Sequence, residues 1–172
     1  MIEIAVADRG MVMDVLSRLR RDDMLEMAAA GTDLTRLTDQ LIRYKLFAFC
    51  AWSMDRGPIS IWGAVQKRHG VAAGFAFGTD DWGYAVLTMV RQIRGFVLPM
   101  LVDVGIHRVE AVAMRRRDDV RRFMSLIGAQ AEGTLTGYGT EGEDFVSYRW
   151  LSDEYVGNRA GKAQANSAYP AH

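Results

Sequence analysis

The densest group of side chains that could do chemistry is an arginine cluster, made of Arg115, Arg116, Arg117, Arg121 and Arg122. Clustered guanidinium groups can bind phosphate, nucleic acid or an acidic protein surface. They can also form a solvated helix face whose charge is offset by nearby aspartates, and we favour this interpretation. The whole chain balances 21 Lys and Arg against 21 Asp and Glu residues, and no aromatic residues alternate with the cluster. We therefore expect no sequence-specific nucleic-acid binding.

The residues that commonly bind metals or act as nucleophiles are few and far apart. His69, His107 and His172 do not lie within ligand spacing of one another or of Cys50, so we expect no metal site. Cys50 is the only cysteine and lies in an apolar run. This excludes an internal disulfide and favours a buried structural thiol in a reducing compartment.

The longest apolar run, at 84–106, is interrupted by Arg91, Arg94, Pro99 and Asp103. It is therefore not expected to span a membrane. The first ten residues lack a basic leader followed by an apolar core, so no signal peptide is expected either.

Hydrophobic periodicity predicts a single α+β domain over 1–151, with a mostly antiparallel mixed sheet flanked by helices. The expected elements are a strand at 2–7, helices within 11–31 and at 33–45, a three-stranded antiparallel meander at 46–54, 59–68 and 71–78, a long helix over about 82–104, a strand at 107–114, a helix at 117–128 and a closing hairpin over 129–151. Pro99 should kink or break the long helix, because proline lacks a backbone N–H. Residues 152–172 are polar and small, without periodicity, and are expected to form a tail that needs a partner to order it.

The segment from Gly105 to Gly133 resembles the C-terminal half of the GCN5-related N-acetyltransferase (GNAT) fold. The resemblance covers roughly Ile2 to Leu151 and rests on the order of the elements and on a short helix that ends at Gly128. It implies that acetyl-CoA would bind where the fourth strand meets the long helix. The positions that would contact acetyl-CoA are Phe77, Gly78, Gly83, Tyr84 and Ala85.

The family pattern at this place is Gln/Arg-x-x-Gly-x-Gly/Ala, and backbone N–H groups at the helix N-terminus bind the pyrophosphate. Gly83 and Ala85 match this pattern, but Asp80 replaces the expected cation or amide. Asp80 and Asp81 would repel the pyrophosphate, since like charges about 4 Å apart cost roughly 4 kcal/mol at an effective dielectric of 20. We interpret the two aspartates as caps of the following helix.

The resemblance also implies a tyrosine as general acid in the short helix, where this chain has Phe123 and Met124. The nearest hydroxyl is Ser125, and Glu110 is the carboxylate that could act as a general base. If the chain is active, Ser125 and Glu110 are therefore its catalytic candidates. The missing tyrosine and the acidic loop argue for the fold without the activity.

The layout is also similar to that of the acetyltransferase-like internal virion proteins of T7-like bacteriophages. The matching pieces are Trp62–Asp81, the long helix and Ile127–Ala129. We therefore expect a non-catalytic virion component, made in the host cytoplasm and present in several copies. It would use no cofactor and would contact portal, tail or internal core proteins. The expected partner-binding residues are Tyr155, Asn158, Arg159, Lys162 and Tyr169 in the tail, and Arg115, Arg116, Arg117 and Arg121.

The alternative is an acetyl-CoA-dependent N-acetyltransferase that acts on a small amine or on a protein amino group. Acetyl-CoA is a cofactor only under this alternative.

Overall fold

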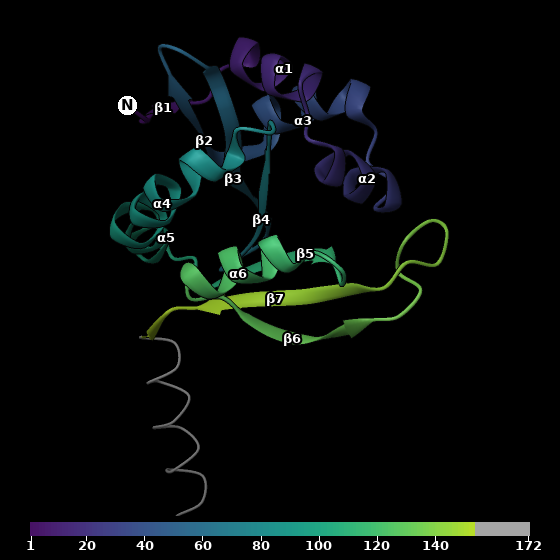
Figure 1. Cartoon of the computed structure of the whole chain (residues 1–172). Helices are drawn as coiled ribbons and strands as arrows, with labels where there is room; N and C mark the ends of the chain where they lie inside the picture. The colour runs from purple at the N-terminus through teal and green to yellow at the C-terminus, as the bar shows by residue number, and fades with distance from the viewer. Residues whose placement is uncertain (154–172) are drawn as a thin grey trace, which may run out of the picture.

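The structure is a computed structural model, which describes residues 1–153 (Figure 1). Its elements are β1 (Glu3–Val6), α1 (Arg9–Ser17), α2 (Arg21–Ala29), α3 (Leu34–Tyr44), β2 (Lys45–Ser53), β3 (Gly57–Arg68), β4 (Val71–Gly78), α4 (Trp82–Gln92), the π-helical segment η1 (Ile93–Val97), α5 (Leu98–Asp103), β5 (Arg108–Met114), α6 (Asp118–Leu126), β6 (Gln130–Leu135) and β7 (Phe145–Leu151). The tail residues that were expected to bind partners, Tyr155, Asn158, Arg159, Lys162 and Tyr169, lie outside the described residues.

The seven strands form one sheet in the order β1-β2-β3-β4-β5-β7-β6. Every neighbouring pair is antiparallel except β4 and β5, which run parallel. The two strands run parallel because a helical crossover, α4–η1–α5, connects them. The crossover returns the chain to the end of the sheet at which β4 began, so β5 runs in the same direction. The predicted α+β fold with a mixed, mostly antiparallel sheet is confirmed.

Helices cover both faces of the sheet, and the alternation of side chains along the strands supplies each face with apolar residues. On β3, Ile61 packs with α1 and α3, whereas the next residue, Trp62, packs against α4. Figure 1 shows α1 and α3 on one side of the sheet and α4 and α5 on the other. Cys50 lies in the hydrophobic core between the sheet and helices α1 and α3, and it is fully buried, as its apolar context predicts.

The tight turn between β3 and β4 depends on Gly70. Its φ is +72°, in the left-handed region that residues with a side chain avoid. A Cβ there would also lie 2.4 Å from His107 Cε1, well inside van der Waals contact. The predicted meander therefore has a turn at Gly70, where the backbone conformation and the nearby His107 side chain both require a glycine.

The long helix runs through Pro99 without a break, but its hydrogen bonding becomes π-helical just before the proline. Gln92 ends α4, the next turn is π-helical, and Pro99 lies in the first turn of α5. Proline lacks the N–H that would continue the helical hydrogen bonding, and the π-helical turn next to it marks this irregularity. Leu101 is buried, but Val104 is 64% exposed because α5 ends at Asp103.

The segment Trp82–Asp103 is long and apolar enough to cross a bilayer by composition alone. In the folded chain Met89, Ile93, Val97 and Leu101 pack on the sheet, whereas Leu87 and Phe96 of the same segment are exposed. The core that this segment builds lies directly beside the parallel strand pair.

Candidate functional site

The two parallel strands separate soon after they meet. β4 pairs with β5 only over Val71–Ala73 and Arg108–Glu110, although β4 continues to Gly78 and β5 to Met114. Beyond Ala73, β4 therefore has an edge that faces a gap instead of a neighbouring strand. We call this space the β4–β5 gap; Figure 1 shows β4 and β5 diverging.

The free edge of β4 presents backbone hydrogen-bonding groups to the gap. A strand residue points its N–H and C=O to the same side, and the side alternates along the strand. Both backbone groups of Gly78 are bonded on the gap side, so those of Ala76 and Gly74 face the same way, and of these the Gly74 N–H still pairs with β5 at the Ala73–Glu110 rung. These small residues leave room for an extended ligand to run along the strand.

A cavity of about 310 Å³ fills the gap, and most of its wall is apolar. Phe77 lines it from β4, and Trp82, Phe123 and Ile127 line it from α4 and α6. The cavity also has walls from α2 and α3, which lie on the opposite face of the sheet. It therefore passes through the sheet at the gap, so two reactants could meet there from opposite faces.

Helix α2 bridges the ends of the two separated strands. The N–H of Gly78, the last residue of β4, donates to Asp23 Oδ2 at 2.8 Å. The N–H of Met114, the last residue of β5, donates to Glu26 Oε2 at 3.0 Å. The backbone N–H of Arg20 donates to the Gly78 carbonyl at 2.9 Å. Two carboxylates three residues apart on one helix face thus bind both strand ends.

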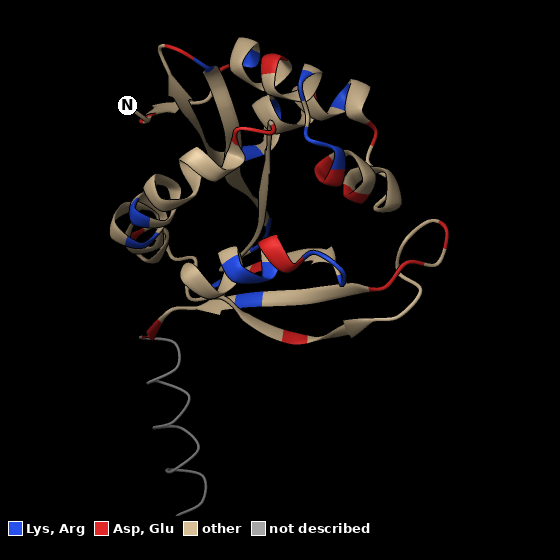
Figure 2. Cartoon of the chain, viewed as in Figure 1, with Lys and Arg blue, Asp and Glu red and all other residues tan. Residues whose placement is uncertain are grey.

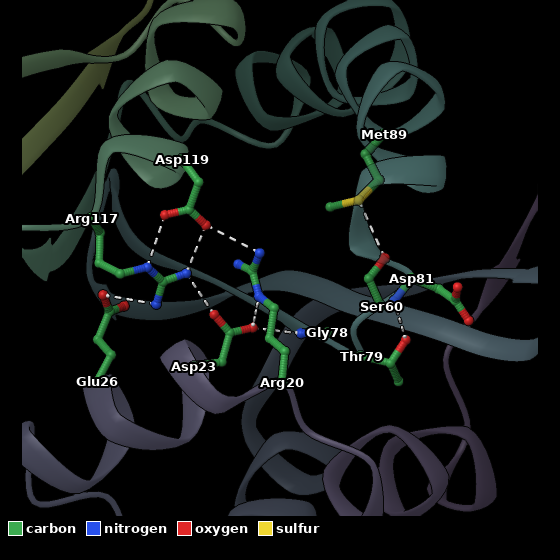
Figure 3. A network of polar contacts seen from close by, with 10 residues as sticks. All are labelled: Arg20, Asp23, Glu26, Ser60, Gly78, Thr79, Asp81, Met89, Arg117 and Asp119. Carbon is green, nitrogen blue, oxygen red and sulfur yellow. Dashed lines mark hydrogen bonds and ion pairs between the residues drawn. The ribbon is translucent and has the colours of Figure 1, made fainter.

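A buried ion network surrounds this bridge, and Figure 3 shows its members. Arg117 is 4% exposed, and its guanidinium donates to Asp23 Oδ1 at 2.7 Å, to Asp119 Oδ1 at 2.9 Å and to Glu26 Oε2 at 3.4 Å. Arg20 Nη1 lies 3.1 Å from Asp119 Oδ2. Arg20 Nε lies 2.8 Å from Asp23 Oδ2, close enough for an ion pair although not aligned as a hydrogen bond. Figure 2 shows the acidic residues on α2 and the basic loop that leads into α6.

The network shifts the pKa values of its carboxyl groups in different directions. Burial raises the pKa of Glu26, although the charge of Arg117 opposes the rise. The hydrogen bonds from Arg117 lower the pKa of Asp119 to about 2. Burial thus favours the protonated form of Glu26, whereas Arg117 favours the ionised form of Asp119.

At the N-terminus of α4, Gly83 faces open space, because a Cβ there would have no atom within 4 Å outside its own helix. Packing does not require a glycine there, so the open side can admit a ligand close to the backbone. Tyr84 next to it is exposed, and the Arg56 guanidinium lies 4.0 Å from its ring centroid. Ala85 is fully buried beneath them.

The interpretation of Asp81 as a capping side chain is wrong. Asp81 occupies the N-cap position, but its side chain makes no capping hydrogen bond. Arg56 Nη1 instead donates to Asp81 Oδ1 at 2.6 Å. Because Arg56 offsets the Asp81 charge at this helix end, the repulsion of a pyrophosphate is weaker than the sequence suggested.

The two predicted catalytic residues are poorly placed. Lys67 and Arg108 each bind the Glu110 carboxylate at 2.7 Å, and these bonds lower its pKa to about 2. A carboxylate with so low a pKa is a weak base. Ser125 is exposed on α6 and does not line the cavity. We therefore correct both assignments.

The arginine cluster is also divided by the fold. Arg115, Arg116 and Arg121 are exposed, and their role in partner binding stays a prediction. Arg117 was predicted to bind a partner too, but it is buried in the ion network and does not form part of an accessible surface.

Sequence reasoning missed Asp23 and Glu26, although their spacing on a predicted helix was a usable signal. It also missed Tyr148 of β7, which is 6% exposed and lines the cavity. Burial raises the Tyr148 pKa, Arg121 opposes the rise and the charge of Glu26 adds to it, so the phenol stays protonated at neutral pH. Trp62 lines the cavity as well, and its buried indole Nε1 has no hydrogen-bond partner among the described residues.

Among the described residues, no group of three or more His, Cys, Asp and Glu side chains is placed to hold a metal ion. The polar groups of the site are instead carboxylates, guanidinium groups and a phenol.

Comparison with solved structures places this architecture among acetyltransferases. The ribosomal-protein-S5-alanine acetyltransferase of Vibrio fischeri aligns with a TM-score of 0.65 and 12% identity, over 89% of this chain and 94% of that one. The spermidine N-acetyltransferase of Vibrio cholerae, solved with CoA and spermine, aligns with a TM-score of 0.65 and 13% identity, over 90% and 98%. No protein-family model matches the chain, and no curated protein matches it in sequence. The chain thus has the GNAT fold that its sequence resembles.

Proposed function

We propose that this chain is an acetyl-CoA-dependent N-acetyltransferase that transfers an acetyl group to an amine. The observation that carries the proposal is the β4–β5 gap with its cavity of about 310 Å³, which is open to residues of both sheet faces. The likeness to acetyltransferase structures supports the fold that this reaction would use. The reaction itself rests on the site residues described next.

The residues around the gap fit the parts of acetyl-CoA. The edge of β4 offers the C=O of Gly74 and the N–H and C=O of Ala76, which the two amides of a pantetheine arm can bond in strand fashion. The N-terminus of α4 at Gly83 offers helix N–H groups and open space for a pyrophosphate. Arg56 lies beside this helix end and offsets the charge of Asp81 there. Bound acetyl-CoA would supply the activated acetyl group.

Glu26 is the proposed general base. Both of its recorded hydrogen bonds fall on Oε2, from Met114 N–H and from Arg117, which leaves Oε1 to receive a proton from the amine. Glu26 would accept this proton as the N–C bond forms. Tyr148 would donate a proton to the sulfur as the C–S bond breaks, in place of the tyrosine that α6 lacks.

Isothermal titration with acetyl-CoA tests the proposal, and Gly83→Glu is the informative variant. A glutamate in the first turn suits the helix dipole but would repel a pyrophosphate. We expect the unaltered chain to bind with a Kd of about 1 mM or tighter, and Gly83→Glu to weaken binding at least about tenfold. Gly133→Glu is the matched control, because a Cβ at Gly133 also meets open space but lies on β6. Absence of binding by the folded protein would overturn the proposal.

A second candidate is a non-catalytic component of a bacteriophage virion that contacts portal, tail or core proteins. The closure of the wide end of the gap by the protein's own side chains favours the non-catalytic part of this candidate, and the virion role rests on the similarity of layout alone. Trp82 and Phe123 pack edge to face at 5.5 Å, joining α4 to α6, and Arg20 lies 4.5 Å from the Trp82 ring centroid. The Arg117–Asp23 pair joins α6 to α2 at the same end.

This second candidate predicts a folded protein that does not bind acetyl-CoA at millimolar concentration. It also predicts that a chain lacking residues 152–172 still folds but is not incorporated into virions. Acetyl-CoA binding that Gly83→Glu weakens would contradict it.

A further inference from the structure

The part of the cavity that faces α2 and α3 has a hydrophobic wall. Six apolar side chains line it, namely Met27, Leu37, Leu41, Phe75, Phe77 and Val112. Phe75 and Phe77 are alternate residues of β4 and point toward α1 and α3, away from α4. The cavity as a whole has room for roughly ten water molecules at ~30 Å³ each, far more than an acetyl group needs. The remaining space lies where an amine acceptor would approach.

The carboxylates at the edge of this wall have few oxygen atoms free to bind a further cation. Asp23 Oδ1 accepts a hydrogen bond from Arg117. Its Oδ2 accepts one from the Gly78 N–H and lies within ion-pair distance of Arg20. Asp119 uses both of its oxygens for arginines. Glu26 uses Oε2, so its Oε1 is the one carboxylate oxygen of the network without a recorded bond.

One open carboxylate oxygen can receive one amino group. A second ammonium on the same molecule would lie against the hydrophobic wall, and burying an unpaired charge costs several kcal/mol. The other charged residues that line the cavity are two arginines, and both are already paired: Arg149 lies 2.9 Å from Glu132, and Arg20 contacts Asp23 and Asp119. A polyamine would therefore fit poorly, whereas an apolar substituent would gain from leaving water.

We propose that the acceptor is a primary monoamine with a hydrophobic aryl or alkyl group. Its amino group would bind at Glu26, and its apolar part would pack against Met27, Leu37, Leu41 and Phe75. This inference rests on the proposed acetyltransferase function, and it names the substrate class of the same site. The amine would gain the acetyl group and lose a proton to Glu26, and CoA would leave as the thiol.

Release of CoA can be followed with a thiol-reactive dye in the full-length protein. The only cysteine, Cys50, is fully buried, and burial raises its pKa to about 11, so its background reaction should be slow. The panel contains 2-phenylethylamine and hexylamine as hydrophobic monoamines, and spermidine and putrescine as polyamines. We expect kcat/KM to be at least about tenfold higher for the monoamines.

Met27→Glu tests the wall itself. A new carboxylate there should lower kcat/KM for 2-phenylethylamine about tenfold or more and narrow the preference over spermidine. Met24→Glu is the matched control, because Met24 lies on the same helix, is 47% exposed and does not line the cavity. It should leave the preference unchanged.

The outcomes separate this inference from the proposed function. Equal or better turnover of polyamines would overturn the inference and leave the acetyltransferase function intact. Acetyl-CoA binding without acetylation of any monoamine in the panel would also overturn it. A folded protein that binds no acetyl-CoA would overturn the proposed function itself and the inference with it.

Discussion

Glu26 and Glu110 are both carboxylates beside the β4–β5 gap, and their surroundings move their pKa values in opposite directions. Lys67 and Arg108 bind Glu110 directly and lower its pKa to about 2, so it holds no proton under ordinary conditions. Burial raises the pKa of Glu26, and only one of its oxygens has recorded bonds. The difference assigns proton transfer to Glu26 and a structural role to Glu110.

Glu26→Gln tests that assignment. The amide can still accept the Met114 N–H but cannot take a proton, so we expect kcat to fall about 100-fold or more with the acceptor amines. The KM for acetyl-CoA should change little. Steady-state kinetics across pH should also show that kcat/KM of the unaltered chain rises as Glu26 loses its proton, and that the variant lacks this rise.

Asp22→Asn serves as the control for Glu26→Gln, because Asp22 is an exposed acid on the same helix. It should retain the activity of the unaltered chain. Full activity in Glu26→Gln would show that another group accepts the proton.

Arg117 holds three carboxylates in a buried place, and its removal should be costly. In Arg117→Met, Asp23, Glu26 and Asp119 lose a common partner while remaining close together. Breaking a buried pair by removing one partner costs about 3–5 kcal/mol, and we expect a loss of that size in the free energy of unfolding. Urea denaturation followed by tryptophan fluorescence measures it.

Arg116→Met is the matched control, since Arg116 is exposed and adjacent in sequence. It should change the free energy of unfolding by no more than about 0.5 kcal/mol. If the two variants lose similar amounts of unfolding free energy, the buried network stabilises the fold no more than an exposed surface charge does.

At the scale of elements, the start of α4 and the end of β4 are shaped by two glycines with different reasons to be there. A Cβ at Gly78 would lie 2.7 Å from Trp82 Cε3 and 3.0 Å from the Ile59 carbonyl oxygen, whereas a Cβ at Gly83 would meet nothing within 4 Å outside its own helix. Gly78 is required because β4 packs closely against Trp82 of α4. Gly83 leaves open the place where we propose a pyrophosphate binds.

The paired substitutions Gly78→Ala and Gly83→Ala should therefore have opposite effects on stability. Gly78→Ala forces Trp82 to move and should lower the free energy of unfolding by about 1–3 kcal/mol. Gly83→Ala should raise it by up to about 1 kcal/mol, because alanine restricts the unfolded chain and favours the helix. Thermal unfolding monitored by circular dichroism distinguishes them. A loss of stability in Gly83→Ala would indicate a packing role that the open space does not suggest.

The elements themselves were largely predictable from the sequence, because their signals are local. Alternation gave the three-stranded meander, and the glycine turn at Gly70 separated two of its strands. Pro99 marked the place where the crossover helix becomes irregular, directly after its π-helical turn. The short helix before Gly128 carried the resemblance that led to the GNAT fold.

At the scale of the whole molecule, the candidate site was hidden because its residues come from distant parts of the chain. Asp23 and Arg117 lie 94 residues apart, and no local pattern relates them. Asp81 looked like a helix cap because Arg56, its partner, is 25 residues away. The β4–β5 gap is equally non-local, since it depends on where two parallel strands stop pairing. Sequence periodicity finds elements, whereas the site depends on how they are assembled.

The stability of the whole molecule should depend on pH in two separate ranges. The folded pKa values of Glu110 and Asp119, both about 2, lie below those of the unfolded chain, near 4. Their contribution is thus fully present above about pH 5 and is lost as the pH falls toward 2. Glu26 acts with the opposite sign, because its folded pKa is raised. Its contribution is fully present below its unfolded pKa, about 4.3, and is lost as the pH rises through the folded value.

Urea denaturation at about pH 7, 5 and 3 separates these contributions. We expect stability to stay level or rise slightly from pH 7 to 5 and then to fall toward pH 3. Glu110→Gln should flatten the fall, because it removes a carboxylate whose proton uptake favours the unfolded chain. Glu26→Gln should remove any rise and leave the fall intact. The same pH dependence in the unaltered chain and in Glu26→Gln would contradict the raised pKa of Glu26, and with it the proton-accepting role that the site assigns to this residue.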